Sequence, residues 1–133
     1  MQTHTHIDLR SERGQSLVEF ALVAPALLLI LFGIIQFGIA FRNSITLADA
    51  VRTGARAASV NRTSSDPVGI ATNAVMSAAS DLDKAKVKVT VSPSPWSQGG
   101  QVTVQATYPY EINILGLVVT SGDLKSSTTE RVE

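Results

Sequence analysis

The sequence predicts an α+β protein in which a long N-terminal helix crosses a membrane and continues into a small head with a second helix and an antiparallel sheet of about three strands. Two observations predict this fold. The chain is apolar from Leu17 to Phe41 except for Glu19 and Gln36, and a helix of about 20 apolar residues spans the hydrocarbon core of a bilayer. Further along the chain, apolar residues change from a helical spacing to strict alternation, which is typical of half-buried strands.

These patterns divide the chain into three segments. We expect residues 1–14 to be a polar leader segment, residues 15–60 to form the long helix with its transmembrane part at 17–41, and residues 61–133 to form the head. The apolar run is longer than the hydrophobic region of a secretory signal peptide, which has about 7 to 15 residues. An anchoring span is therefore favoured over a cleaved secretory signal.

Glu19 is the residue of this span that most needs a physical reason. A carboxylate at the centre of a bilayer costs about 2.5 to 3.5 kcal/mol. If the helix begins near Gln15, Glu19 lies about 6 Å along the axis, close to the headgroups. It is then either an interfacial acid in contact with water or a charge whose partner appears after processing. Cleavage after Gly14 would create an amino group on Gln15, about one helical turn away or on a neighbouring subunit.

Four other residues of the span bear on helix packing. Pro25 lacks an N–H and is expected to kink the helix, either harmlessly or as a flexible point with a functional role. Gly33 and Gly38 offer small surfaces where another helix can approach closely. We expect helix packing in the membrane to involve Phe20, Pro25, Gly33 and Gly38.

The helical pattern continues beyond Phe41 to about Val60. Arg52 and Arg56 share one side of this segment and are interpreted as a solvated face rather than as a site for an acidic partner. Apolar residues recur at three- or four-residue steps and predict one narrow buried face, made of Ile45, Ala48, Val51, Ala55 and Ala58.

The head begins with a polar break at residues 61–65. Asp66 can cap a helix and Pro67 suits its first turn, so a second helix is predicted from this point. Asp81 and Asp83 are disfavoured near a helix C-terminus and are expected to end it. The buried stripe of this helix is predicted at Ala71, Ala74, Val75, Ala78 and Leu82.

Two strands follow, because valines alternate with polar residues at 86–91 and a similar alternation returns at 102–106. Trp96 lies in their connection and is expected either to fold back onto the hairpin or to stand at an interface. A third, polar edge strand is predicted at 124–131.

Residues 108–110, the sequence Tyr-Pro-Tyr, are expected to end the second strand. The apolar stretch Ile112–Thr120 is too short to cross a bilayer. It is predicted to be either a buried strand or loop, or a patch that contacts another subunit.

Composition argues against several function classes. Eleven basic and eleven acidic residues leave no net charge to attract nucleic acid or anionic lipid. The chain has no cysteine, so disulfides and thiolate metal sites are excluded, and His4 and His6 alone make a poor metal site. No Ser-His-acid set, phosphate-binding glycine loop or supported carboxylate pair is recognisable. We therefore expect no enzyme activity, no cofactor and no metal.

The junction at Gly14 resembles a known processing site. Residues 14–20, Gly-Gln-Ser-Leu-Val-Glu-Phe, look like the cleavage site of type IV pilin-like precursors. The longer segment 13–21 is similar to TadE-like proteins, which are pilin-like components of the tight adherence (Flp) pilus system. The likeness continues through residues 49–56 and the terminal residues 129–133, so it extends over most of the chain.

This resemblance implies that a prepilin peptidase facing the cytoplasm removes the leader after Gly14, and that Glu19 serves processing or subunit registration. The implied partners are that peptidase, other pilin-like subunits, inner-membrane pilus assembly proteins and membrane lipid, but no nucleic acid. The implied protein is a single-pass membrane protein with an extracytoplasmic head, incorporated into a surface pilus and supporting adhesion. Gln15 departs from the aromatic residue or Met of many type IV pilins, so methylation of its amine is not expected.

Three functions remain open at this stage. The favoured one is a minor pilin or pseudopilin processed after Gly14. The alternative is an uncleaved single-pass scaffold of a secretion or pilus assembly complex, and a third is a binding module released by signal peptidase. Basic residues flank both ends of the span, so the resemblance, and not charge, decides the topology.

Overall fold

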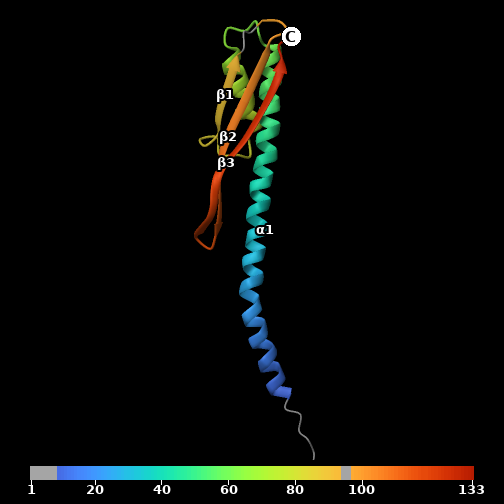
Figure 1. The fold of residues 1–133 in the computed structure, drawn as a ribbon, viewed down its shortest axis with the longest axis vertical. Coiled ribbons are helices and arrows are strands. Elements are labelled where there is room, and N and C mark those ends of the chain that lie inside the picture. Colours follow the sequence, from blue (N-terminus) through green and yellow to red (C-terminus); the bar gives the residue numbers. More distant parts are fainter. Residues whose placement is uncertain (1–8, 94–96) are drawn as a thin grey trace, which may run out of the picture.

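The computed structural model describes residues 9–93 and 97–133 as one long helix with a small head packed along its C-terminal half (Figure 1). The predicted α+β architecture is confirmed. His4, His6 and Trp96 lie outside the described residues. The elements are helices α1 (Leu9–Val60) and α2 (Pro67–Ala78) and strands β1 (Lys88–Pro93), β2 (Gln101–Ile114) and β3 (Leu117–Arg131).

Helix α1 begins earlier than predicted, because residues 9–14 are already helical. Leucine, arginine and glutamate in this stretch favour helix, and a glycine inside a helix costs only about 1 kcal/mol relative to alanine, so Gly14 does not interrupt α1. The end of α1 at Val60 agrees with the prediction. Pro25 is accommodated inside the helix, and α1 bends gently in its blue part (Figure 1), as expected where a proline removes a backbone hydrogen bond.

Helix α2 starts where the sequence predicts. The Asp66 carboxylate accepts a hydrogen bond from the Gly69 N–H at 2.8 Å, and Pro67 occupies the first turn. The helix ends at Ala78, before Asp81 and Asp83. The predicted stripe is largely confirmed, although Ala79 is fully buried while Ala74 and Ala78 are only partly so.

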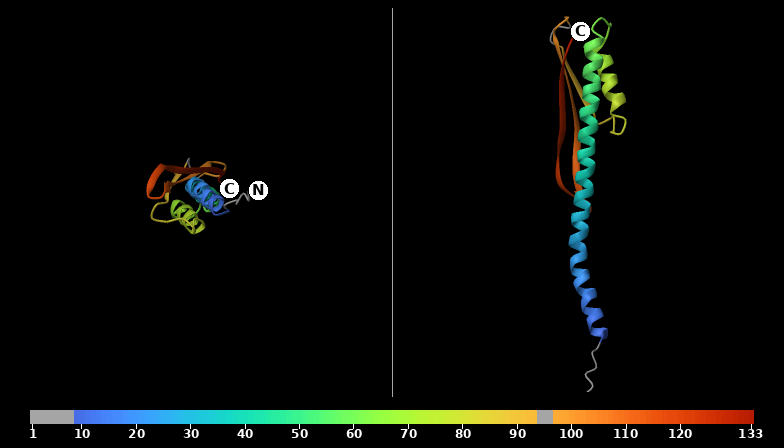
Figure 2. Two further views of the ribbon diagram at one scale, coloured as in Figure 1. Left: turned by 90° about the horizontal axis from the view of Figure 1, so that it is seen from below. Right: turned by 90° about the vertical axis from the view of Figure 1, so that its right-hand side faces the viewer.

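The C-terminal half of α1 lies between α2 on one side and the sheet on the other (Figure 2). Because two layers cover it, more of α1 is buried than the single narrow face that the sequence predicted. Leu47 and Ala50 join the core, and Ile45 is 49% exposed, so the prediction for Ile45 was wrong. Two residues rotate a helix by about 200°, so Ile45 points away from the side on which Leu47 is buried.

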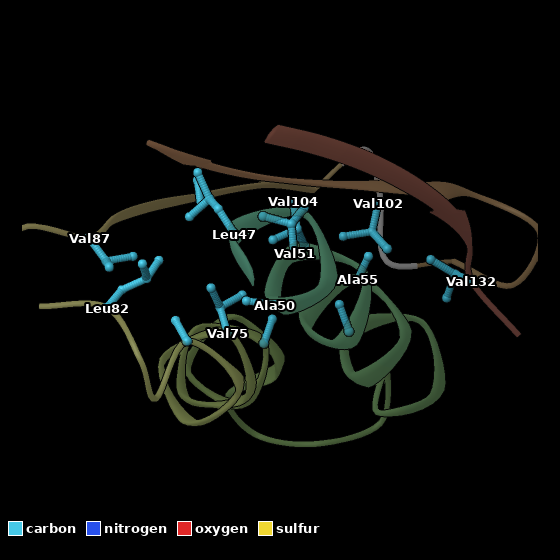
Figure 3. Close-up of a cluster of buried hydrophobic side chains, with 14 residues drawn as sticks. Leu47, Ala50, Val51, Ala55, Val75, Leu82, Val87, Val102, Val104 and Val132 are labelled. Carbon is cyan, nitrogen blue, oxygen red and sulfur yellow. The ribbon is translucent and has the colours of Figure 1, made fainter. Parts of the chain in front are cut away.

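The sheet has the order β1-β2-β3, and both pairings are antiparallel. The alternation predicted for β2 is confirmed, since Val102, Val104 and Ala106 are fully buried. Figure 3 shows Val102 and Val104 pointing from the sheet toward Val51 and Ala55 of α1. These side chains and Val75 of α2 form one core.

The prediction that residues 108–110 end the second strand was wrong. Strand β2 continues to Ile114, and Pro109 lies opposite Asp123 of β3. Pairing with β1 stops at Thr107, so β2 has an unpaired edge beyond that residue, and a proline is compatible with such an edge. The third strand likewise begins before residue 124, at Leu117, although its position at the edge of the sheet is as predicted.

A two-residue turn joins β2 to β3. Leu115 and Gly116 have φ values of 53° and 88°, which is the pattern of the tight hairpin turns that match strand twist. The Gly116 N–H donates a hydrogen bond to the Asn113 side chain at 2.8 Å. Leu115 and Leu117 are 73% and 74% exposed, so residues 112–120 are not a buried strand or loop. The alternative, a patch that contacts another subunit, stays a prediction.

Candidate functional site

The candidate site is the part of α1 that extends beyond the head, from Gly14 to Phe41. Within the described residues, α1 is the one helix that is long and apolar enough to cross a membrane. Its most apolar stretch has a mean hydropathy of 2.6, and no part of that stretch is buried against the head. A continuous exposed apolar surface of this size marks a membrane or protein contact. The arrangement indicates a single-pass membrane protein. Its large exposed side chains include Leu17, Phe20, Leu22, Leu27, Ile34 and Phe37.

The predicted processing junction, Gly14–Gln15, lies inside α1. Gly14 is exposed, and a Cβ built on it would meet no atom of the described residues within 4 Å. The peptide bond that follows Gly14 is therefore open to an approaching molecule, although it is held in helical geometry.

Glu19 and Gln15 are brought together on one side of α1. The Gln15 side-chain amide donates a hydrogen bond to a Glu19 carboxylate oxygen at 3.2 Å, and both residues are exposed. Sequence reasoning predicted that the Gln15 amine would lie near Glu19, but it missed this amide contact. The four-residue spacing of an amide and an acid on a helix was the signal that could have found it.

The four residues predicted to pack helices have no second helix beside them in the part of the chain that the structure describes. Phe20 is 66% exposed. A Cβ added to Gly33 or Gly38 would meet no described atom within 4 Å. Packing of Phe20, Pro25, Gly33 and Gly38 against other helices stays a prediction.

Charged residues mark the point where α1 enters the head. Arg42 forms a salt bridge of 2.5 Å with Asp81, which lies just beyond α2, and both side chains are more than half exposed. Arg52 pairs with Asp49 on the same helix at 3.5 Å, in keeping with a solvated face. The Arg42–Asp81 pair was not predicted, because its members are 39 residues apart.

At its other end the head has a polar cleft of about 820 Å³ between α1 and the C-terminal residues. Its charged lining residues carry both signs, namely Arg56, Arg131, Glu130 and Glu133. Among residues 9–93 and 97–133, no three His, Cys, Asp or Glu side chains gather as metal ligands.

Comparison with known proteins supports the resemblance seen at Gly14. No curated protein and no solved structure matches the chain significantly. The family model described as TadE-like protein matches residues 14–56, which contain the glycine junction, Glu19, the exposed span and the first part of the head-packing segment. The terminal residues 129–133, where the sequence also suggested a likeness, lie outside the match. Residues 14–56 are therefore similar to TadE-like proteins, in the segment where the motif at Gly14 predicted the likeness.

Proposed function

We propose that the chain is a pilin-like subunit of a tight adherence pilus assembly, a minor pilin or pseudopilin that a prepilin peptidase processes after Gly14. The TadE-like match supports a pilus-associated, pilin-like component. The observation that carries the proposal is the exposed apolar length of α1, with Glu19 one helical turn from Gln15. In this proposal the head lies outside the cytoplasm, and the protein supports surface adhesion together with other pilin-like subunits and inner-membrane assembly proteins.

Gly14 is suited to proteolysis of a helical substrate. A peptidase has to unwind the helix around the bond that it cuts, and a glycine makes local unwinding easier by about 1 kcal/mol than an alanine would. The absence of a side chain and the open space around Gly14 leave the bond accessible. After cleavage, α1 would begin at Gln15 and keep its apolar length.

The new amino group gives Glu19 a role. An α-amino group has an ordinary pKa of about 7.7 to 8.0, so it is largely positive at neutral pH. It would lie about 6 Å from Glu19 along the helix axis, or nearer to Glu19 of an adjacent subunit if the two helices were staggered. A buried carboxylate is strongly destabilising without a partner, so pairing with this amine would set the register between subunits.

The second candidate function is an uncleaved single-pass scaffold of the pilus or secretion complex. One observation favours it: α1 is helical without interruption from Leu9 through Gly14. In that case the leader would remain part of the membrane helix and Glu19 would stay an interfacial acid bonded to the Gln15 amide.

The deciding experiment is the intact mass and N-terminal sequence of the protein from membranes and from sheared surface material, in cells with and without the prepilin peptidase. An N-terminus at Gln15 that depends on the peptidase supports the pilin-like subunit. A retained leader in both strains supports the scaffold, and a start beyond Phe41 would refute both.

Glu19 variants separate processing from assembly. We expect Glu19→Ala to reduce cleavage or incorporation into pili more than it reduces membrane insertion. Glu19→Gln keeps a hydrogen-bonding side chain and removes the charge, so it should resemble Glu19→Ala if pairing with the amine matters. Gln15→Ala is the matched control, because it removes the amide contact and keeps the amine. Normal cleavage and normal pili in Glu19→Ala would refute the role of Glu19.

A further inference from the structure

The tip of the β2–β3 hairpin is an exposed apolar surface to which the proposed function assigns no specific contact. No charged residue occurs between Glu111 and Asp123. Leu115, Leu117 and Val119 are 73%, 74% and 63% exposed. Such a cluster at the end of a projecting hairpin is unfavourable in water, so it is expected to contact another apolar phase.

The hairpin places this tip beside the membrane-spanning part of α1. Strands β2 and β3 extend past the rest of the head and run along α1 toward its N-terminus (Figures 1 and 2). Tyr110 and Ile112 line a groove together with Phe37 and Phe41, which belong to the predicted span. From Ile112 to the turn at Leu115 the strand advances about 10 Å further.

Charged and polar groups indicate where the headgroup region lies at the end of the span nearer the head. The Arg42–Asp81 pair is more than half exposed, and Glu111 lines a groove with Gln36 and Asn43. The turn at Leu115 is about 14 Å from Glu111 along the strand. If Glu111 lies among the headgroups, the tip reaches the boundary between headgroups and acyl chains or a few ångströms below it. Interfacial segments insert to a depth of about 5–10 Å, so the reach of the hairpin matches that depth.

The distribution of side chains favours lipid over a protein partner. Ile114 pairs with Leu117 on one face of the hairpin, whereas Val118 lies on the other face, opposite Asn113. A protein groove would cover one face, while lipid surrounds both. The strands hydrogen-bond to each other, but their outer edges need polar partners, which headgroups and interfacial water supply. The tip therefore stops at the interface.

We propose that the hairpin tip, residues 112–120, inserts into the membrane interface at the end of the span nearer the head and forms a second lipid contact beside α1. With two contacts, the head is held against the bilayer in one rotational orientation about α1. This inference requires that α1 crosses a membrane, and it does not depend on cleavage after Gly14.

Site-specific labelling tests the proposal, since the chain has no cysteine of its own. A single cysteine carrying an NBD fluorophore is placed at the tip (Leu115→Cys), at an exposed position of the same strand pair (Ser127→Cys) and in the span (Leu28→Cys). The full-length chain is reconstituted in phosphatidylcholine vesicles that contain lipids spin-labelled near the headgroup or deep in the acyl chain. We expect the tip label to lose most of its fluorescence to the shallow quencher, the span label to the deep quencher and the Ser127 label to neither.

The other outcomes overturn the proposal in distinguishable ways. A tip label that behaves like the Ser127 label, while the span label is quenched, refutes lipid insertion and leaves the span intact. A tip label shielded both from lipid quenchers and from aqueous iodide means that a second copy of the chain covers the tip. An unquenched span label refutes the membrane helix itself, and the tip proposal with it. Val118→Cys repeats the measurement on the opposite face and must give the same result as Leu115→Cys.

Discussion

Gly54→Ala tests the close packing of α1 against α2. A Cβ on Gly54 would lie 2.3 Å from a Val75 methyl carbon and 3.1 Å from the Ala71 carbonyl oxygen. Carbon atoms in favourable contact are about 3.5–4.0 Å apart, so Val75 or the whole of α2 has to shift by more than about 1 Å. Val75 is fully buried and β-branched, so it has few other rotamers available.

The size of the effect follows from two opposing terms. Overpacking a well-packed core costs about 1–3 kcal/mol, whereas replacing glycine by alanine inside a helix contributes about 0.8–1.0 kcal/mol of stability. Because a Cβ at 2.3 Å is a severe overlap, we expect a packing cost in the upper half of that range and a net loss for the head of about 1–2 kcal/mol. For a domain of this size that lowers the melting temperature by about 4–16 °C.

The assay is thermal unfolding of the full-length chain in detergent micelles, followed by near-UV circular dichroism. This signal reports aromatic packing, whereas the far-UV signal is dominated by α1, whose apolar half stays helical in the micelle. Gly38→Ala is the matched control, because a Cβ there meets no described atom within 4 Å, and the melting of the head should not change.

A double mutant isolates the contact itself. Val75→Ala removes the methyl groups that Gly54→Ala would strike, so Gly54→Ala should cost at least about 1 kcal/mol less on that background. If Gly54→Ala leaves the head as stable as the wild type, or costs the same in the presence and in the absence of Val75→Ala, the two helices do not approach as described and the reasoning is refuted.

Three further substitutions test the capping of α2, an exposed salt bridge and the hairpin turn. Asp66→Ala removes the cap that accepts the Gly69 N–H and should destabilise the head by about 1 kcal/mol, seen as a lower melting temperature; an unchanged value would contradict the cap. Arg42→Ala breaks the exposed pair with Asp81 and should lower the stability of the head by less than about 1 kcal/mol, a loss that should shrink further in high salt; a larger, salt-independent loss would show that the pair is not solvated. Leu115→Asn should slow hydrogen exchange at the turn, because Asn tolerates a positive φ better than Leu, and it should reduce the lipid quenching of a label at Val118; faster exchange would contradict the turn geometry.

Much of the fold could be predicted because its signals are local. Asp66 and Pro67 mark the start of α2 by capping chemistry alone, and the alternating valines predict β1 and the first half of β2. The predictions that were wrong concern features that depend on tertiary context. A proline normally ends a strand, and Pro109 lies on an unpaired edge only because β1 begins at Lys88, opposite Thr107. Ile45 fits the helical period but lies outside the two surfaces that α2 and the sheet cover.

The candidate site likewise has a part that the sequence could predict and a part that depends on tertiary packing. Gly14, Gln15 and Glu19 are neighbours on one helix, so periodicity alone places Glu19 one turn from Gln15, and their hydrogen bond follows from the same spacing. The position of the apolar tip beside Phe37 could not be predicted, because it requires the length of β2 and the packing of the sheet on α1. Sequence reasoning left residues 112–120 open for that reason.

Leu115 shows why the hairpin tip is better explained by an external apolar phase than by folding. A side chain at positive φ costs about 1–2 kcal/mol, and Asn or Asp before glycine suits this turn better. Leu115 has φ 53° and is 73% exposed, so neither its backbone nor burial in the head accounts for a leucine there. A residue that is unfavourable both locally and in water is expected where something outside the fold compensates for it. Transfer of one leucine from water into an apolar environment is worth about 1.5–3 kcal/mol, which is enough to offset the strain of the turn. The same leucine that weakens the isolated hairpin would therefore strengthen its contact with the bilayer.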